Sequence, residues 1–451
     1  MRELSRGSAV LRQVGGRAPR VALLVYNDAH NDSRVLKTAA SLRAAGAEVR
    51  IFAVARRRAG YAEGPAVIGD GIEADRAPEF ELVRYRPGRL ALAVARRLTG
   101  RTPAAEARHP RRSTPTSRAS FTITDLWLRT YRTLSLGVYW LHTARAAVCW
   151  RPEVVHANDG NTLAPALWIA QRCGAQIVYD SHELWLHRNV RSDRPVAPWA
   201  ERAIEAVGIR RAAGVITVSP SIAEWLQRRY LLSQAPALVR NAPRGPSSDS
   251  LAESPAQGRL RELAGLDDGD RVIAYGGRIT TARGIEETLA TLTLLSDEVH
   301  FVLLGYGEPD YLVSLYTLIE RLGISGRVHF VGAVAPDEVS AALADADLSV
   351  VFVRPICLSY EYSLPNKLFE SIHAGVPVVA ADLPDTASLV RELAVGEIFR
   401  TDHPADMAST IESVLSDPQA YRAAARAASS ALTWEHEETA LLNLYVEVLD
   451  R

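Results

Sequence analysis

The feature that most constrains the fold is an alternation of short apolar runs with longer amphipathic stretches, which occurs twice along the chain. The first run, Val21–Tyr26, is continuously apolar, like strands that are covered on both faces, and the stretch after it has helical spacing until Gly46. This order predicts parallel sheets with helices on both faces, an α/β protein of doubly wound, Rossmann-like domains. Strands are expected at residues 21–26, 49–54, 154–156, 177–180 and 215–218, and again at 272–275, 301–304, 328–331, 348–353 and 376–381.

Length and a break in composition divide the chain. Its 451 residues are long for one domain, and Pro, Ser and Gly become frequent between Val239 and Leu263. We expect a tail over residues 1–20, one Rossmann-like domain over 21–236, another over 237–425, and a C-terminal helix within 426–451 that packs back toward the first domain. Residues 56–120 do not follow the alternation of strands and helices, and we expect them to form an extended, partly disordered, arginine-rich insertion.

Charge and cysteine content exclude several classes of protein. The chain has 52 basic and 52 acidic residues, which gives no reason to expect nucleic acid as a partner. Cys149, Cys173 and Cys357 lack the spacing of a disulfide framework or a zinc site. No apolar run is long enough for a membrane span or a signal peptide, so we expect a cytoplasmic protein.

A loop, a short helix and a strand are predicted from Ser363 to Ala381. Pro365 suits the start of that helix and Gly375 the position just past its end. Free amide groups, the positive end of the helix dipole and the ammonium of Lys367 meet at the helix start, so this point would attract a phosphate. Glu370, one turn later, can accept hydrogen bonds from a ribose diol. The alternative is an ordinary surface helix on which Lys367 is a solvated charge.

A second pattern suited to phosphate follows the first apolar run of the second half. Residues 275–284 read Tyr-Gly-Gly-Arg-Ile-Thr-Thr-Ala-Arg-Gly. Glycines permit close approach of the backbone to a ligand, and the guanidinium groups of Arg278 and Arg283 can clamp a diphosphate from two sides.

Together the two segments resemble the family 4 glycosyltransferases, which have the GT-B fold, use nucleotide-sugar donors and retain the anomeric configuration. The likeness is carried by Gly-Gly-Arg-x4-Arg-Gly, by Pro-Asn-Lys-x-x-Glu and by Ala-Gly-Val-Pro-Val-Val. It covers the chain from Val21 to Trp434, except for the arginine-rich insertion. The resemblance implies two Rossmann-like domains that face an interdomain cleft, the first for the acceptor and the second for the donor nucleotide.

The resemblance also implies roles for single residues. Arg278 and Arg283 match the basic pair that grips the donor diphosphate, and Glu370 matches the glutamate that holds the ribose. In a subgroup with Ser-x-Pro-x-Lys, Lys367 would approach the phosphates. The first glutamate of the Glu-x7-Glu motif is replaced by Tyr362, which leaves recognition of the donor sugar open. The expected donor-binding residues are Gly277, Arg278, Arg283, Gly305, Ser363, Asn366, Lys367 and Glu370.

Polar residues at strand ends of the first half complete the expected site. His182 matches a family histidine close to the transferred sugar, although a lone histidine there is often only hydrogen-bonded structure. With Arg278, Arg283 and Lys367 it makes up the expected catalytic set. The acceptor-side candidates are Asn31, Arg34, His156 and Asp159, and the alternative for Asp159 is a helix cap.

The predicted reaction is transfer of a sugar from a nucleoside-diphosphate donor to an acceptor hydroxyl, with retention and without a cofactor or an essential metal. The acceptor is unknown, and a glycan, a lipid-linked or a small-molecule acceptor would each fit. One rival is a nonhydrolysing sugar-nucleotide epimerase, which would need catalytic carboxylates. The other is a noncatalytic nucleotide-sugar-binding protein, favoured by the missing first glutamate.

The stretch Arg84–Arg132 suggests a further partner. It contains 12 arginines and only two acidic residues, Glu106 and Asp125, so its net charge is +10. With Phe121, Trp127 and Tyr131 nearby, it could dock peripherally on anionic lipid at the inner face of a membrane. The alternative is a solvated arginine-rich loop.

Overall fold

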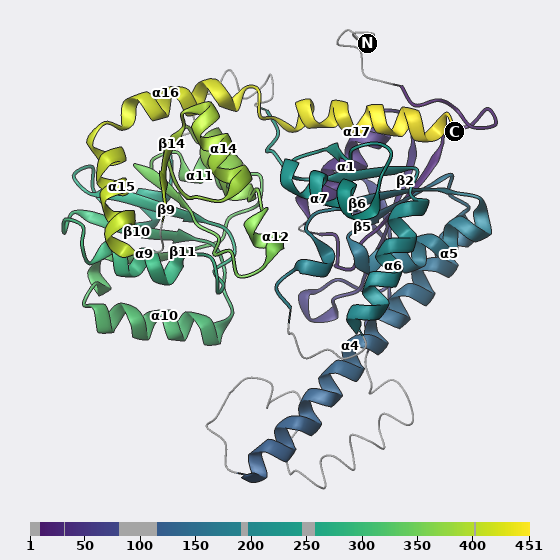
Figure 1. The fold of residues 1–451 in the computed structure, drawn as a ribbon, viewed down its shortest axis with the longest axis horizontal. Coiled ribbons are helices and arrows are strands. Elements are labelled where there is room, and N and C mark those ends of the chain that lie inside the picture. Colours follow the sequence, from purple (N-terminus) through teal and green to yellow (C-terminus); the bar gives the residue numbers. More distant parts are fainter. Residues whose placement is uncertain (1–9, 31, 81–114, 191–196, 246–257, 401–402) are drawn as a thin grey trace. The chain divides into compact units, whose positions relative to one another are not determined.

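The computed structural model describes residues 10–30, 32–80, 115–190, 197–245, 258–400 and 403–451 (Figure 1). The chain divides into two compact units. The first unit comprises residues 13–177, and the second comprises residues 178–451 together with residues 1–12. The unit boundary falls within strand β6, Gln176–Ser181, and each unit is described by itself.

The first unit contains a sheet in the order β3-β4-β2-β1-β5. All its neighbouring strands are parallel except β3 and β4, which form an antiparallel pair. Its strands are β1 Arg20–Leu24, β2 Glu48–Val54, β3 Gly64–Ile68, β4 Ile72–Ala77 and β5 Val154–Asn158, and its helices are α1 Ser33–Ala44, α4 Pro115–Trp150 and α5 Leu163–Cys173. The central strands β1 and β5 are almost wholly buried, which agrees with the apolar run Val21–Leu24 in β1.

The expectation of an extended insertion over residues 56–120 is wrong for its first part and its end. Residues Arg57–Ala59 form a short 3-10 helix, η1, and β3 and β4 then extend the sheet through β2. In β4, Ile72 and Ala74 are buried while Glu73 is exposed, the alternation of a strand with one covered face. Helix α4 already begins at Pro115, and residues 81–114 lie outside the described part of the chain.

In the second unit, β6, β7 Gly214–Thr217 and β8 Ala237–Leu238 run parallel. Helices α6 Ala197–Arg211 and α7 Pro220–Tyr230 accompany them. The last helix, α17 Trp434–Leu449, falls within the predicted range of residues 426–451 and lies against β7 and β8. The close fit is visible at Gly214, where an added Cβ would lie 3.0 Å from the side chain of Leu444.

The second unit also holds a six-stranded sheet in the order β11-β10-β9-β12-β13-β14, with all neighbours parallel. Its strands are β9 Arg271–Gly276, β10 Val299–Leu304, β11 Val328–Gly332, β12 Leu348–Val351, β13 Val378–Ala381 and β14 Gly396–Phe399. Its helices are α8 Leu260–Ala264, α9 Ile285–Leu292, α10 Pro309–Leu322, α11 Val339–Leu343, α12 Leu358–Glu361, α13 Asn366–His373, α14 Pro384–Leu393, α15 Pro404–Ser416 and α16 Pro418–Ser429.

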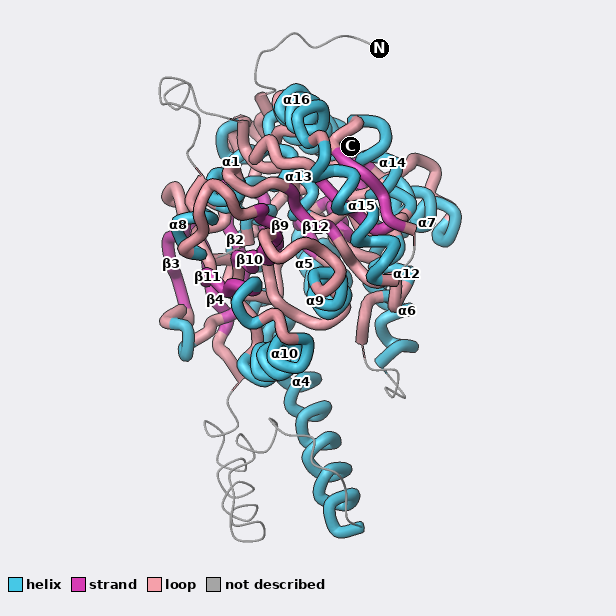
Figure 2. The backbone as a smooth tube through the Cα atoms, turned by 90° about the vertical axis from the view of Figure 1, so that its left-hand side faces the viewer, coloured by secondary structure: helices cyan, strands magenta, loops and turns pink. Residues whose placement is uncertain are grey.

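Both faces of this sheet are covered, as a doubly wound domain requires. On one face, Ile273 and Tyr275 of β9 pack in a core with α9, α10 and α15. On the other, Val272 and Ala274 pack in a core with α8 and α11, next to the core around α13, α14 and α16. Figure 2 shows the strands between these groups of helices. The alternation along β9 confirms the predicted doubly wound α/β fold and places the strand ends at one edge of the sheet.

Candidate active site

The loops after β9 and β10 are in direct backbone contact. The amide of Gly277 donates to the carbonyl of Leu304 over 2.9 Å. An added Cβ on Gly305 would lie 1.8 Å from the carbonyl oxygen of Gly277, and Gly277 itself has a φ of 113°. A larger residue at Gly305 would push the loops apart, whereas a side chain at Gly277 would meet no atom within 4 Å but would strain the backbone at that φ. The predicted donor residues Gly277 and Gly305 therefore hold the two loops together, whatever else they contact.

A missing side chain at the end of β9 leaves room for Glu370. An added Cβ on Gly276 would lie 3.9 Å from Oε2 of Glu370. Glu370 lies on α13, one turn after the helix start, and is half-buried. Its carboxylate therefore lies next to the glycine loop, as expected for a group that shares a ligand with that loop.

Lys367 is a buried cation on the first turn of α13. The side chain is only 8% exposed, and Nζ lies 3.8 Å from the centroid of the Tyr275 ring. Within the described part of the chain, Nζ has no hydrogen-bond partner. Burial lowers the pKa of Lys367 to about 7, with a further contribution from the charge of Arg283, while Glu370 acts in the opposite direction. The alternative of a solvated helix charge is therefore wrong.

The two arginines of the glycine loop differ in their surroundings. Cζ of Arg283 lies 4.8 Å from the centroid of the Tyr360 ring, at the end of α12. Arg278 is exposed and pairs with Glu308 over 3.0 Å, with both side chains more than half exposed. Such a pair in water contributes little to stability, so Arg278 can exchange Glu308 for another anion at small cost.

The start of α13 is held in place by contacts of the preceding loop. The hydroxyl of Ser363 donates to the carbonyl of Tyr360 over 2.7 Å, and the hydroxyl of Thr386 donates to the carbonyl of Ser363 over 3.0 Å. Pro365 occupies the N-cap position, and Asn366 is exposed at the first helical position. The positive end of the helix dipole thus lies beside Lys367, which is an arrangement that favours a bound phosphate.

His182 follows the end of β6 and contacts a buried carboxylate. Its Nε2 lies 3.2 Å from Oδ2 of Asp180, whose side chain is 1% exposed. The charge of Asp180 also contributes to the raised pKa of Tyr445 on α17, although burial is the main cause. A buried carboxylate at this distance orients the imidazole, which is suited to a positioning or acid-base role.

The acceptor-side candidates have varied surroundings. Asn31 lies outside the described residues. Arg34, on the first turn of α1, and His156, inside β5, are both buried, so contact of His156 with an acceptor would require β5 to open. Asp159 has φ 62° and ψ 166°, a combination that residues other than glycine rarely adopt, and its side chain does not cap the short helix that follows. The cap alternative for Asp159 is therefore wrong, and its contact with an acceptor stays a prediction.

The loop that contains Asn31 is held by its own polar groups. The Asn27 amide donates to Asp32 over 2.8 Å, and the backbone amide of Ala29 donates to the Asn27 side chain. Asp32 accepts from the backbone amide of Val35 and is the cap of α1. These side chains are explained by local structure.

Only part of the expected lipid-binding stretch lies within the described residues. Residues 81–114 lie outside the described part of the chain, so docking through Arg84–Arg132 stays a prediction. Tyr131 packs its ring against Phe80, with centroids 5.3 Å apart. No helix in the described ranges combines the length and the apolar character needed to cross a membrane. The described residues also contain no cluster of three or more His, Cys, Asp or Glu placed to hold a metal ion.

Three residues near the candidate site were not predicted. Tyr275 lies against Lys367, Tyr360 lies against Arg283, and Asp180 lies against His182. Tyr275 directly precedes the glycine pair and Asp180 lies two residues before the histidine, so proximity in sequence was the available signal. Tyr360 had no signal, because its contact joins separate segments.

Comparison with known families gives two matches along the chain. A model described as "Glycosyl transferase 4-like domain" matches residues 32–242, and a model described as "Glycosyl transferases group 1" matches residues 257–431. The matches lie on either side of the Pro-, Ser- and Gly-rich segment.

Curated relatives are similar at moderate identity. An alpha-D-kanosaminyltransferase of Streptomyces kanamyceticus is 27% identical over 282 residues, which is 59% of this chain and 68% of the relative. A 2-deoxystreptamine glucosyltransferase of the same organism is 27% identical over 50% of this chain and 57% of its own length. A D-inositol 3-phosphate glycosyltransferase of Mycolicibacterium gilvum is 30% identical over 41% of each chain. The chain thus spans less than two thirds of the last two relatives.

Solved structures share the fold over nearly the whole chain. Sucrose-phosphate synthase from Thermosynechococcus elongatus has a TM-score of 0.67 at 17% identity, over 95% of this chain and 98% of that one. HepE of Anabaena, solved in complex with UDP-glucose, has a TM-score of 0.65 at 15% identity, over 96% and 99%. At these identities the likeness is one of fold.

Proposed function

Because the chain belongs to the family 4-like glycosyltransferases with the GT-B fold, we propose that it transfers a sugar from a nucleoside-diphosphate donor to an acceptor hydroxyl with retention of anomeric configuration. The donor lies at the ends of β9 and β10 and at the start of α13. Support for a nucleotide sugar comes from the solved relative in complex with UDP-glucose and from the cationic groups at these loops.

The observation that carries the proposal is the buried ammonium of Lys367. Its Nζ lies over the Tyr275 ring and has no hydrogen-bond partner in the described part of the chain. An unsatisfied buried cation is costly unless a ligand completes it. A diphosphate supplies the missing charge, and the amides at the start of α13 and the guanidinium group of Arg283 supply further contacts.

In the proposed reaction, the acceptor oxygen forms a bond to the anomeric carbon while the bond from that carbon to the diphosphate oxygen breaks. The acceptor proton passes to the departing phosphate, so atoms and charge balance. Negative charge grows on the leaving group, and Arg278, Arg283 and Lys367 stabilise that charge more in the transition state than in the ground state. The proposal requires no metal ion or cofactor. His182 would lie close to the transferred sugar, with its ring oriented by Asp180.

Glu370 is proposed to bind the ribose of the donor. Its carboxylate lies beside Gly276, at the end of β9. A carboxylate can accept both hydroxyl protons of a vicinal diol, which fixes the sugar of the nucleotide without selecting the base.

The experiment that tests this function has two stages. Thermal stabilisation by UDP-, GDP- and other nucleoside-diphosphate sugars first selects the donor, since a ligand at 100 times its Kd adds about 2.7 kcal/mol. The selected donor, labelled in its sugar, is then incubated with the protein and a panel of acceptors. Transfer of label to an acceptor with the anomeric configuration of the donor is expected.

The rival functions give different results in the same experiment. An epimerase returns an isomerised nucleotide sugar. A noncatalytic binding protein is thermally stabilised by the donor but leaves the donor unchanged. Either result would replace the proposal.

A further inference from the structure

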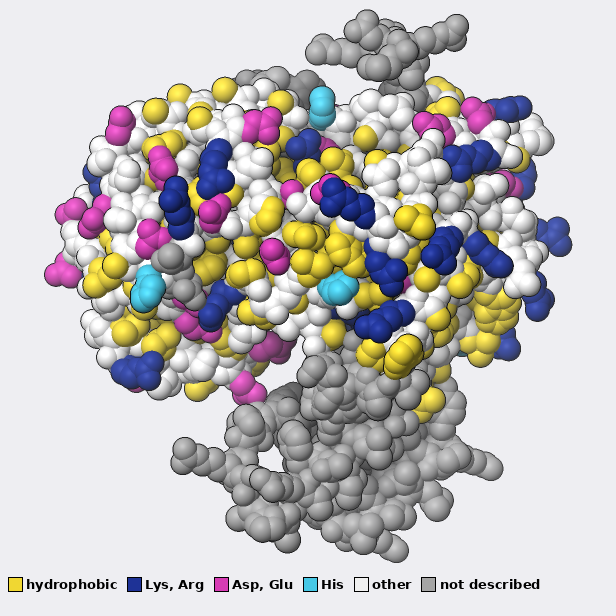
Figure 3. Space-filling model, in the orientation of Figure 1, with side chains coloured by type: hydrophobic (Ala, Val, Ile, Leu, Met, Phe, Trp, Pro, Cys, Tyr) yellow, Lys and Arg dark blue, Asp and Glu magenta, His cyan; other side chains and the backbone are white. Residues whose placement is uncertain are grey.

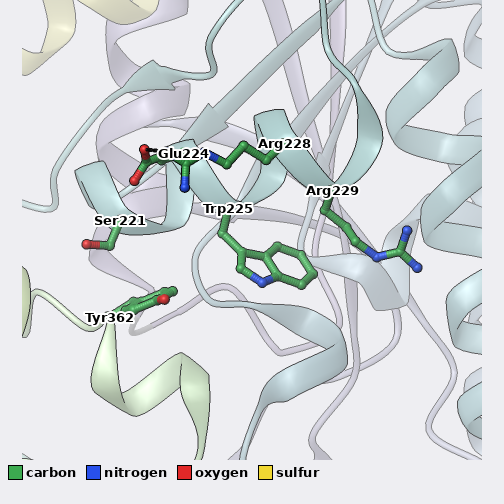
Figure 4. A pocket seen from close by; sticks show the side chains of 6 residues that line it. All are labelled: Ser221, Glu224, Trp225, Arg228, Arg229 and Tyr362. Atoms are coloured by element: carbon green, nitrogen blue, oxygen red, sulfur yellow. Dashed lines mark ion pairs between the residues drawn. The ribbon is translucent and has the colours of Figure 1, made fainter.

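A pocket of about 310 Å³ opens beside α7 in the second unit. It is formed by one face of that helix and by Tyr362, which follows α12 (Figure 4). The pocket is lined by Ser221, Glu224, Trp225, Arg228, Arg229 and Tyr362. This volume suits a small molecule the size of a sugar.

Aromatic rings form one wall of the pocket. Figure 4 shows the indole of Trp225 and the ring of Tyr362 beside the same opening. The Trp225 ring packs edge-on against His187, with centroids 5.0 Å apart, and its centroid lies 6.2 Å from that of Tyr230. These two ring contacts hold the indole in place, and a sugar or polyol ring can pack on the part of it that lines the pocket.

Tyr362 is fixed through its backbone. The hydroxyl of Ser219 donates to the carbonyl of Tyr362 over 2.7 Å. Ser221, which lines the pocket, donates its hydroxyl to Asp385 over 2.8 Å. The carboxylate of Asp385 therefore already has a hydrogen-bond partner. The wall that joins α7 to the segment after α12 is thus built by direct hydrogen bonds.

The charge of the pocket is positive. Arg228 pairs with Glu224. Arg229 forms no ion pair with a described carboxylate, although its charge acts on the pKa of Glu205, and it lies 5.5 Å from the Tyr230 ring centroid. Arg202 on α6 adds a further positive charge, and both Arg202 and Arg229 contribute to the lowered pKa of His187, after burial as the main cause. Figure 3 shows basic side chains gathered over α6 and α7 next to a hydrophobic area. The excess of guanidinium groups favours a phosphate.

Chain connectivity ties the pocket to the candidate active site. Tyr362 directly precedes Ser363, which holds the loop before α13 and Lys367. His187, which packs on Trp225, lies in the segment that begins with His182. In the same segment the amide of Leu184 donates to the hydroxyl of Ser359 over 3.2 Å. Residues that line or support the pocket therefore belong to the same two chain segments that carry the proposed chemistry.

We propose that this pocket binds the acceptor and that the acceptor is a sugar or cyclic polyol that carries a phosphate. Its ring packs on Trp225 and Tyr362, and its phosphate contacts Arg229 and Arg228. The inference rests on the proposed glycosyl transfer and names its acceptor class. It also gives Tyr362, which replaces the first motif glutamate, a place in the acceptor pocket.

The test measures binding of glucose 6-phosphate, fructose 6-phosphate and inositol 1-phosphate, together with glucose, fructose, inositol and inorganic phosphate, to the full chain saturated with UDP. At least one sugar or polyol phosphate is expected to bind tenfold or more tightly than both its neutral parent and inorganic phosphate. Arg229→Ala should raise the Kd of that ligand at least tenfold and leave the Kd of the neutral parent unchanged. Trp225→Ala should weaken both.

Arg211→Ala is the matched control, because Arg211 is an exposed arginine at the end of α6 outside the pocket lining. It should leave every Kd unchanged, and all three variants should keep the wild-type affinity for UDP. The inference is overturned if none of the three phosphates binds more tightly than its parent, or if Arg229→Ala and Arg211→Ala behave alike. Transfer from the donor to a neutral acceptor, with no binding of these phosphates, would refute this inference and leave the proposed function standing.

Discussion

Two polar loops that follow buried strands use their side chains in opposite ways. After β1, Asn27 and Asp32 bond to each other and to nearby backbone amides, so this loop satisfies its own polar groups. Around the end of β9, Lys367 is buried against Tyr275 and has no hydrogen-bond partner among the described residues. Both segments contain residues that the sequence analysis placed in the candidate site. The difference teaches that an unmet buried charge points to a ligand, whereas a satisfied polar loop is explained by the fold.

Replacement of Lys367 by methionine tests the comparison most severely. Lys367→Met fills a similar volume without the charge, so the rate of transfer should fall by roughly 100-fold to 1000-fold, as for loss of one preorganised electrostatic contact. Steady-state kinetics with the selected donor measure this. A rate within threefold of wild type would remove Lys367 from the donor site.

The same variant should be more stable than the wild type. The pKa of Lys367 is about 7 in the folded chain against an ordinary 10.5, so between these values the unfolded chain binds more protons. The wild type therefore gains stability as pH rises from about 7 toward 10.5. At pH 7 the buried lysine lowers the free energy of unfolding by several kcal/mol, because each tenfold change in proton affinity corresponds to about 1.4 kcal/mol. Denaturant unfolding across this range should show the rise in the wild type and lose it in Lys367→Met.

The two arginines should differ in a graded way. Arg283→Ala and Arg278→Ala each remove a contact to the leaving diphosphate and should each lower turnover on the order of 100-fold, with the fold retained. We expect the larger loss for Arg283, which lies close enough to Lys367 to affect its pKa. Glu308→Ala is the matched control, since it removes only the exposed partner of Arg278. Wild-type rates in both arginine variants would contradict the donor site.

Glu370→Gln should weaken binding of the nucleotide without abolishing catalysis. The amide keeps the shape of the side chain but no longer accepts charge-assisted hydrogen bonds from the ribose hydroxyls. We expect the Kd of the nucleotide to rise about tenfold, which corresponds to about 1.4 kcal/mol. Calorimetric titration with free nucleoside diphosphate and with its 2′-deoxy form measures the effect. If the variant loses affinity equally for both forms, Glu370 does not bind the ribose.

Asp32→Ala should give the smallest effect, and on stability alone. The variant removes the cap of α1 and a partner of Asn27, at a cost of about 1 kcal/mol in the free energy of unfolding. Affinity for the nucleoside diphosphate should stay at the wild-type value. A large loss of donor affinity with unchanged stability would abolish the distinction between the two loops.

Much of the sheet architecture could be predicted because its strands are continuous apolar runs with strong periodicity. The strands β3 and β4 were missed because residues 56–120 were interpreted as a single extended insertion, although the alternation of Ile72, Glu73 and Ala74 was present. The helix α17 was predicted within residues 426–451 because no Pro or Gly interrupts its sequence.

Burial of the site residues could not be predicted in the same way. Helical spacing placed Lys367 on the polar side of α13, whereas the Tyr275 ring of a different strand covers it. The pocket beside α7 combines Trp225 with Tyr362, and nothing in the sequence relates these positions. Contacts between distant segments decide both cases, and they follow from tertiary packing.

The most direct test of the donor site is the number of protons taken up when UDP binds at pH 8, measured by calorimetry in buffers with different ionisation enthalpies. With a pKa of about 7, most Lys367 side chains are neutral in the free protein at this pH, and a diphosphate beside Nζ raises that pKa. The wild type should take up close to one proton for each UDP bound, and Lys367→Arg, which stays charged, should take up none. Equal proton uptake in the two proteins, or none in the wild type, would contradict the account.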